Sequence, residues 1–335
     1  MARRIAAISK FYLFERRFTI FKMRFPFKLK ENLDYHAAGF GTNAVDYLIR
    51  VNEYPAFNTK AELIESVRSP GGEAASTMAG LSRLGLRTAY AGRFGDDDAA
   101  EIGMSSLVSE KVDISHCQRV RGAATQLAFI IIDDRSGERT ILWKRDAALS
   151  FSESEAPIEL AAAATVLHLT PHDVGAARRM AETARKSGTV VSLDIDNIFD
   201  GMEDLLPLVD VLVASAEFPA KLFPGMEVRR ALRAIRYKFG SAVAGVTLGE
   251  KGSLLLCGDQ FIESSGFAAP GGCKDTTGAG DAFRAGLLYG IISGSTVEES
   301  SRIANAVGAL KCRALGARTS LPTKKELLDF LSTSS

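Results

Sequence analysis

The feature that most constrains the fold is an alternation of apolar, β-branched segments with helical segments that end at glycine. Apolar segments lie at residues 189–195, 209–215 and 242–248, and glycine-ended helical segments at residues 73–85, 173–188 and 227–240. Glycine is the usual residue at which a helix stops, and nearly continuous apolar strands are typical of strands covered on both faces. The alternation therefore predicts an α/β fold with a doubly wound, mostly parallel central sheet flanked by helices.

Two early segments interrupt this alternation. Residues 47–70 and 125–143 are rich in strand-forming residues, and the second contains a turn signal at residues 133–137. Such strands either form a small separate sheet that covers a site as a lid, or they extend the main sheet. We favour the lid, because inserted strand pairs of this kind often cover a binding site.

Charge and cysteine content limit the classes of partner. The chain has 335 residues and a formal net charge of +1, which leaves no overall field to attract nucleic acid. Its four cysteines form no CxxC motif and have no nearby histidine pair, so neither a zinc site nor a disulfide framework is expected. A reduced, cytoplasmic setting fits this cysteine usage.

The first thirty residues differ from the rest of the chain. They carry nine basic residues against one acid, Glu15, with seven aromatic residues between them. Charges interrupt this stretch too often for a membrane span. Three interpretations stay open: a loose extension with the true initiator at Met23, a helix that packs on the body, or a membrane-surface anchor. We expect residues 1–31 to lie outside the core, residues 32–325 to form the main domain, and residues 326–335 to form a tail.

Three glycine-containing stretches could bind a ligand, but each also has an explanation that involves no ligand. GFGTNA at residues 39–44 matches a dinucleotide-binding fingerprint, but the following residues predict a strand where that fingerprint requires a helix. A dehydrogenase is therefore disfavoured. SPGGEAAS at residues 69–76 and VTLGEKG at residues 246–252 place glycines where backbone amides can meet a ligand, and both are also common turns.

The stretch KDTTGAGDAFRAG at residues 274–286 is not explained by an ordinary turn. We expect it to end a strand and begin a helix, so that the amides of Gly278, Ala279 and Gly280 gather at the positive helix end and bind phosphate oxygens. Asp281 then stands beside bound phosphate, where a carboxylate is useful if it takes the proton of an attacking hydroxyl. Helix capping is the alternative role for Asp281, but capping leaves the Gly-Ala-Gly unexplained. No Gly-x-x-x-x-Gly-Lys-Ser/Thr motif supports a P-loop NTPase.

The segment DTTGAGDAF resembles the C-terminal signature of the PfkB, or ribokinase-like, carbohydrate kinases. GTNAVD, PGGEAAS and VTLGEKGSLL are similar to further segments of that family and occur in the family's order, so the resemblance covers residues 39–322. It implies a ribokinase-like fold and an ATP-dependent kinase acting on a sugar hydroxyl, with Mg²⁺ and, in some members, K⁺ as cofactors. The implied partners are a small-molecule sugar and ATP, and analogy adds a homodimer formed through the lid.

The resemblance also assigns roles to individual residues. Asp281 is implied as the catalytic base, with the amides of Gly278, Ala279 and Gly280 as the anion hole. The implied acceptor contacts are Asp46, Gly71, Gly72, Ser76 and Arg145, and the implied ATP contacts are Thr247, Gly249, Gly252 and Asn305. Arg145 and Asn305 fit ordinary surface positions equally well. Asp275 and Thr277 occupy positions near the monovalent-cation site of ribokinase.

Two departures from the family pattern bear on activity. Ser76 stands where the N-terminal signature has asparagine, and SAEF at residues 215–218 replaces an Asn-x-x-Glu motif tied to magnesium and phosphate. Glu217 is a conjectural magnesium contact through water. The acceptor stays open among ribose, fructose, 2-keto-3-deoxygluconate, a sugar phosphate and a nucleoside, for which Phe57 and Phe129 are candidate stacking residues. A sugar-binding regulatory protein without turnover is the competing hypothesis.

Overall fold

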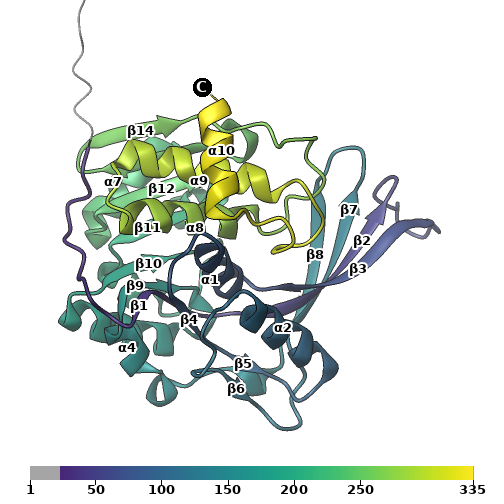
Figure 1. Ribbon diagram of the computed structural model, residues 1–335, viewed down its shortest axis with the longest axis horizontal. Helices are drawn as coiled ribbons and strands as arrows, with labels where there is room; N and C mark the ends of the chain where they lie inside the picture. Colours follow the sequence, from purple (N-terminus) through teal and green to yellow (C-terminus); the bar gives the residue numbers. More distant parts are fainter. Residues whose placement is uncertain (1–22, 335) are drawn as a thin grey trace, which may run out of the picture.

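A computed structural model describes residues 23–334, whose main element is an eight-stranded sheet (Figure 1). Its strands are β1 (Tyr35–Phe40), β4 (Thr88–Ala91), β9 (Ala164–Leu169), β10 (Val190–Leu193), β11 (Val211–Ser215), β12 (Val243–Thr247), β13 (Ser253–Cys257) and β14 (Gln260–Ser264). The order is β14-β13-β12-β11-β10-β9-β1-β4, and the six strands from β12 to β4 are parallel. The prediction of a mostly parallel, doubly wound sheet is confirmed.

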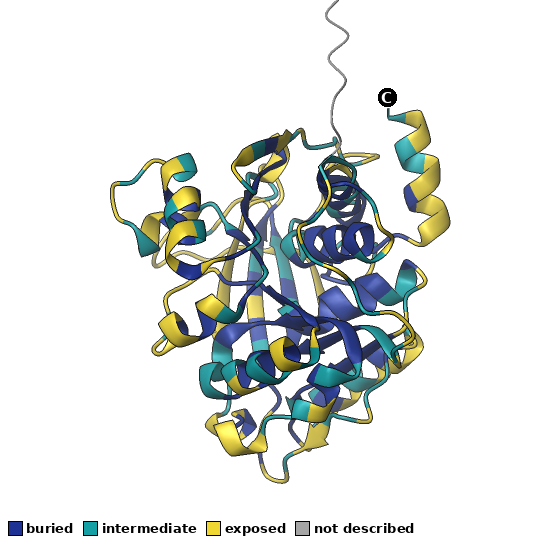
Figure 2. Cartoon of the chain, turned by 90° about the vertical axis from the view of Figure 1, so that its left-hand side faces the viewer, coloured by how far each residue is buried: buried dark blue, intermediate teal, exposed yellow. Residues whose placement is uncertain are grey.

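Helices cover both faces of this sheet. They are α1 (Glu73–Arg83), α2 (Asp98–Ser109), α3 (Ile158–Ala162), α4 (Val174–Ser187), α5 (Met202–Leu205), α6 (Glu217–Leu222), α7 (Val228–Phe239), α8 (Ala279–Ile292), α9 (Val297–Lys311) and α10 (Lys324–Thr333). Successive strand residues point to opposite faces, so Ala37 belongs to the apolar core that includes α1, α8 and α9, whereas Ala38 belongs to the core on the other face, which includes α4 and α7. The strands and the inward helix faces are accordingly buried (Figure 2). None of the helices within residues 23–334 is long and apolar enough to span a membrane.

Glycines end two of the three predicted helices in the left-handed conformation. Gly188 follows α4 with a φ of 73°, and Gly240 follows α7 with a φ of 79°. Residues with a side chain rarely adopt this conformation, so glycine stops a helix there at little cost. The local signal that predicted these helices is therefore also the physical reason that they end.

Four strands form a second sheet, which we call the lid sheet. They are β2 (Ala44–Val51), β3 (Leu63–Gly71), β7 (Leu127–Asp133) and β8 (Arg139–Lys144), in the order β3-β2-β7-β8. Both predicted hairpins form, since β2 pairs antiparallel with β3 and β7 with β8. The lid sheet does not extend the main sheet, and it projects from one side of the body (Figure 1). A short pair, β5 (Arg93–Phe94) and β6 (Gln118–Arg119), lies elsewhere.

Both ends of the described chain pack more closely than expected. Met23, Phe25, Phe27 and Leu29 lie against the core on the α8 and α9 side, so this segment belongs to the body rather than to a separate extension. Residues 1–22, on which the anchor and helix hypotheses mainly depend, lie outside the described residues. The expected tail from residue 326 is instead part of helix α10, which buries Leu327 in the core.

Candidate active site

A cavity of about 930 Å³ lies along the carboxyl edge of the parallel strands. Residues at or just beyond the ends of five neighbouring strands line it: Thr42 after β1, His172 after β9, Asp194 after β10, Ser215 on β11 and Thr247 on β12. In open α/β sheets, ligands bind outside the carboxyl ends of the strands. The lid sheet contributes Asp46, on β2, to the same cavity.

The N-terminus of α8 opens into this cavity. Gly278 is the N-cap with a φ of 75°, and Gly278, Ala279 and Gly280 all line the cavity. A Cβ at Gly278 would lie 2.7 Å from the Cβ of Ala317, so glycine is required there by both conformation and space. The first amides of a helix have no partner within it and face ligands with partial positive charge. This helix end is therefore suited to hold an anion.

Asp281 does not cap this helix, which corrects one of the two roles predicted for it. It lies in the first turn of α8, three residues after the N-cap Gly278, and the residues before that glycine form a loop rather than the end of a strand. The side chain lines the cavity in a largely buried position. Burial raises the pKa of Asp281 to about 6, against the opposing effect of the Arg284 guanidinium. A carboxylate of this basicity beside an anion site can accept a proton near neutral pH.

Asp46 faces the same space from the lid sheet. Burial raises its pKa to about 7, Arg318 opposes that shift, and the charge of Asp281 adds to it. The two carboxylates are therefore close enough for the charge of Asp281 to raise the pKa of Asp46. Gly71 makes room for Asp46, because a Cβ at Gly71 would lie 2.1 Å from the Asp46 Oδ2 atom. Gly72 lines the cavity, and Gly71 is not among the residues that line it.

A cavity that joins an anion-binding helix end to two carboxylates matches a phosphotransferase, and comparison with known proteins decides the family. The pfkB family carbohydrate kinase model matches residues 41–324. The chain belongs to the PfkB family of carbohydrate kinases. PfkB-family kinases are phosphotransferases with a hydroxyl acceptor, and so is this protein.

Relatives of this PfkB-family kinase differ in acceptor. It is 28% identical to a nucleoside kinase of Methanothermobacter thermautotrophicus, over 89% of this chain and 95% of the relative. It is 30% identical to a fructokinase of Escherichia coli, over 77% of this chain and 90% of the relative. The structure of Arabidopsis thaliana ribokinase complexed with ribose and ATP superposes with a TM-score of 0.75 at 23% identity, covering 89% and 98% of the two chains. That likeness confirms the ribokinase-like fold.

The residues predicted to contact ATP come from β12, the turn that follows it and α9. Thr247, Gly249, Gly252 and Asn305 all line the cavity. A Cβ at Gly252 would lie 2.0 Å from the carbonyl oxygen of Ser264, which explains the glycine. Asn305 is 7% exposed and donates to the Ser253 hydroxyl (3.1 Å) and the Ser264 carbonyl (3.0 Å). Asn305 is therefore not a surface residue, and it ties α9 to the β13–β14 hairpin.

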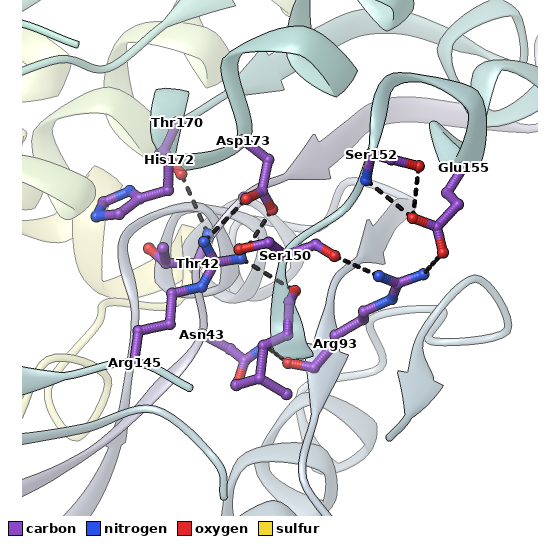
Figure 3. Close-up of polar contacts among 12 residues, drawn as sticks. Thr42, Asn43, Arg93, Arg145, Ser150, Ser152, Glu155, Thr170, His172 and Asp173 are labelled. Carbon is purple, nitrogen blue, oxygen red and sulfur yellow. Dashed lines mark hydrogen bonds and ion pairs between the residues drawn. The ribbon is translucent and has the colours of Figure 1, made fainter. Parts of the chain in front are cut away.

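Besides Gly71 and Asp275, three predicted site residues do not line the cavity. Arg145 forms a bidentate ion pair with Asp173, at 2.7 and 2.9 Å (Figure 3). Ser76 is fully buried and accepts from Arg318 at 3.2 Å. Glu217 is exposed at the start of α6. Arg145 and Ser76 therefore both have protein groups as hydrogen-bond partners in this structure.

Asp275, which was predicted near a monovalent-cation site, already has a cation beside it. Lys311 and Asp275 are both fully buried, and the Lys311 ammonium lies 2.8 Å from the Asp275 carbonyl oxygen and 3.5 Å from its Oδ2. The amides of Thr277 (2.8 Å) and Gly316 (2.7 Å) also donate to the Asp275 carboxylate. The Thr277 hydroxyl lines the cavity and has no partner among the described residues. Lys311 thus anchors the loop that leads into α8.

Sequence reasoning missed several polar residues of the cavity. Glu73, Asp194 and Asp196 line it with Arg139 and Arg284. Arg284 pairs with Asp194 at 2.5 Å, and burial raises the pKa of Asp194 to about 7 against the effect of Arg284. The available signal was the position of Asp194 directly after a buried parallel strand.

Proposed function

We propose that this kinase transfers the γ-phosphate of ATP to a hydroxyl of a neutral, sugar-containing acceptor. The observation that carries the proposal is that one cavity brings together the amides at the start of α8, the Asp281 carboxylate and the Asp46 carboxylate. ATP would lie along Thr247, Gly249 and Gly252, with its γ-phosphate at the α8 N-terminus. The acceptor would lie under the lid sheet, with hydroxyls on Asp46, which only accepts hydrogen bonds when ionised.

In this arrangement Asp281 is the general base. It would take the proton of the acceptor hydroxyl as the oxygen attacks the phosphorus, and the α8 amides would stabilise the charge on the transferred phosphoryl group. Arg139, which donates to the Thr276 hydroxyl at 2.6 Å, stands close enough to lower the pKa of Asp281 and would add positive charge there. Most of the catalysis would come from positioning and electrostatics, as is general for phosphoryl transfer.

Magnesium fits the residues of this site as a companion of ATP. Within residues 23–334, no group of three or more histidine, cysteine, aspartate or glutamate side chains is arranged to hold a metal ion by itself. Asp194 and Asp196 line the cavity and offer carboxylate oxygens, the ligands that Mg²⁺ prefers beside phosphates and water. Bound with ATP, Mg²⁺ would offset the phosphate charge. Glu217 plays no part in this proposal.

ADP release tests the proposed function. Purified protein with Mg²⁺ and ATP is given a panel of sugars and nucleosides one at a time, and ADP is measured by a coupled assay. We expect at least one acceptor to stimulate ADP release well above the rate with ATP alone. If acceptors bind in calorimetry and none stimulates ADP release, the non-catalytic binder replaces the kinase.

The proposed base makes the rate depend on pH in a defined direction. Asp281 works only as a carboxylate, and burial raises its pKa to about 6. We therefore expect kcat to be constant above about pH 7 and to fall roughly tenfold per pH unit once the pH is well below 6, because one proton inactivates the base. Measurement of kcat between pH 5 and 9, with saturating ATP and acceptor, checks this. A flat profile down to pH 5 would contradict the assignment of Asp281.

Potassium is not part of the proposed cofactor set. The Lys311 ammonium already supplies positive charge to the buried Asp275, so we propose that it takes the place of a monovalent cation in fixing the loop before α8. Replacement of Lys311 tests this directly and is treated in the Discussion.

We also propose that the lid sheet forms a homodimer through its outer face. The Phe129 and Tyr47 rings pack together on that face, tilted by 35° with 5.0 Å between ring centroids, and Leu142 lies exposed on the neighbouring strand. Exposed apolar patches of this kind often mark protein contacts. We expect light scattering to give about twice the mass of the 36.0 kDa chain, and the double variant Phe129→Glu/Leu142→Glu to give the single mass. A monomeric wild-type protein would end this proposal.

A further inference from the structure

Three aromatic side chains from different elements meet at the acceptor end of the cavity. Trp143 comes from β8, His172 follows β9 and Phe199 follows β10, and all three line the cavity. The ring centroids of Trp143 and His172 are 6.0 Å apart, and those of His172 and Phe199 are 5.4 Å apart. We call these residues the aromatic wall. Trp143 is 60% exposed although it lines the cavity, so its ring has a free face.

The aromatic wall stands at a defined distance from the hydroxyl-binding carboxylate. Asp46 pairs with Ala128 on β7, and Ala128 pairs with Trp143 on β8, so the three residues form one row across the lid sheet. Neighbouring strands are about 4.8 Å apart, which separates the backbones of Asp46 and Trp143 by roughly 10 Å. A single sugar ring is too short to bind both, whereas a sugar that carries a flat ring system spans this distance.

The charges around the acceptor end disfavour an acidic acceptor. Among the described residues that line the cavity, the arginines are Arg139 and Arg284, which bind Thr276 and Asp194 respectively. Arg145, the remaining candidate, is paired with Asp173 (Figure 3) and does not line the cavity. A carboxylate or phosphate on the acceptor would therefore meet Asp46 and Asp281, and the cation nearest to hand, Arg139, is proposed to serve the transferred phosphoryl group, so an acidic acceptor is unfavourable in this partly buried site.

Two buried polar atoms in this region have no partner among the described residues. Gln126, which is 8% exposed, lines the cavity, and its Oε1 atom has no hydrogen bond. The Nδ1 atom of His172 also has none, and its nearest carboxylate oxygen, on Glu73, lies 4.0 Å away. Buried polar atoms are nearly always hydrogen-bonded, so these two are available for the polar edge of a ligand.

We propose that the acceptor is a nucleoside, with its ribose hydroxyls on Asp46 and its base stacked on the aromatic wall. This inference rests on the proposed function, because it concerns the acceptor of the same reaction. A nucleoside is neutral, spans the row from Asp46 to Trp143, and carries ring nitrogens and exocyclic groups that can pair with Gln126 and His172. Stacking of a base on an aromatic side chain is sequence-tolerant, so several bases should be accepted.

The protein contains one tryptophan, so its fluorescence reports on the aromatic wall directly. Purified protein without ATP is titrated with adenosine, inosine, cytidine and ribose. We expect the nucleosides to quench Trp143 fluorescence in a saturable manner, and ribose to leave it unchanged. ATP, which is proposed to bind along Thr247, Gly249 and Gly252, should not reproduce the quenching. Nucleosides that bind without changing the fluorescence would overturn the placement of the base.

Kinetics then test whether the wall selects the acceptor. Loss of one stacked base costs roughly 10- to 100-fold in affinity, so Trp143→Ala should raise the KM for nucleosides by about that factor. Trp143→Phe should restore most of the affinity, and Tyr237→Ala, an exposed aromatic residue on α7, should change nothing. Turnover of ribose or fructose with a higher kcat/KM than any nucleoside would overturn the inference and leave the proposed function standing. Quenching by nucleosides without phosphorylation of any acceptor would support binding of the base at the aromatic wall and would overturn the kinase proposal.

Discussion

Replacement of Asp281 by asparagine is expected to lower kcat by about 10²- to 10⁴-fold, the usual contribution of a positioned general base. Asparagine has nearly the same shape as aspartate but cannot accept the proton of the attacking hydroxyl. The fold should survive, because the Asp281 side chain does not cap α8 and its backbone carbonyl still receives the hydrogen bond from Thr77. The measurement is kcat from acceptor-dependent ADP release.

Two comparisons make the Asp281→Asn result specific. The Kd of the acceptor, measured by calorimetry without ATP, should change little, since Asp46 and the lid sheet remain. Asp259→Asn is a matched control, because this aspartate is fully exposed at the β13–β14 turn, and its kcat should equal that of the wild type. An Asp281→Asn variant that keeps most of the wild-type kcat would show that another group takes the proton.

Replacement of Lys311 by alanine is expected to lower the free energy of unfolding by about 3–5 kcal/mol, the usual cost of leaving one member of a buried ion pair alone. The Asp275 carboxylate would lose its only described ion-pair partner within residues 23–334 and keep two amide donors. Since Asp275 fixes the loop that ends at Gly278, kcat should fall as well. Urea unfolding and ADP release measure the two effects.

Addition of monovalent cations distinguishes loss of the Lys311 charge from simple loss of packing as the cause of the defect in Lys311→Ala. Alanine leaves space near Asp275, so K⁺ or NH₄⁺ should restore part of the stability and part of kcat in Lys311→Ala, and should have little effect on the wild type. Lys325→Ala, at an exposed i,i+4 pair on α10, is the matched control and should behave as the wild type. A wild-type enzyme that needs K⁺, or a variant that no cation restores, would contradict the proposed role.

Local signals predicted the architecture because the fold uses them directly. The apolar runs predicted at residues 189–195 and 209–215 contain β10 and β11, and α4 and α7 end at glycines in the left-handed conformation, which favours that residue. The turn at residues 133–137 joins β7 to β8 as expected. Such features depend on a few neighbouring residues, which a single sequence displays.

The side-chain partners in the site could not be predicted in the same way, because they come from distant parts of the chain. Arg145 was predicted to contact the acceptor, but in the structure it pairs with Asp173. Ser76 was also predicted to contact the acceptor, but it accepts a hydrogen bond from Arg318, which is 242 residues away in the sequence. Lys311 occupies the last turn of α9, where a lysine usually faces solvent near the helix dipole. Its burial follows from Asp275, which lies 36 residues earlier and has no local pattern that links the two.

The aromatic wall shows the same limit for the acceptor. Phe57 and Phe129 were the aromatic residues predicted for a base, but Phe57 is fully exposed and Phe129 lies on the outer face of the lid sheet. Strand alternation places Trp143 on the inner face instead, since it shares a row with Asp46. The pairing register determines which side chains lie on the inner face of the lid sheet, and the structure is needed to give that register.

Transfer of radiolabelled γ-phosphate from ATP tests the central claim most directly. The wild-type protein is incubated with labelled ATP, Mg²⁺ and the acceptor that best stimulates ADP release, and the products are separated by charge. We predict that the label appears in a phosphoester of the acceptor, in an amount equal to the ADP formed, and that Asp281→Asn forms almost none. Label found only as inorganic phosphate, or an acceptor that binds and never becomes labelled, would contradict the account.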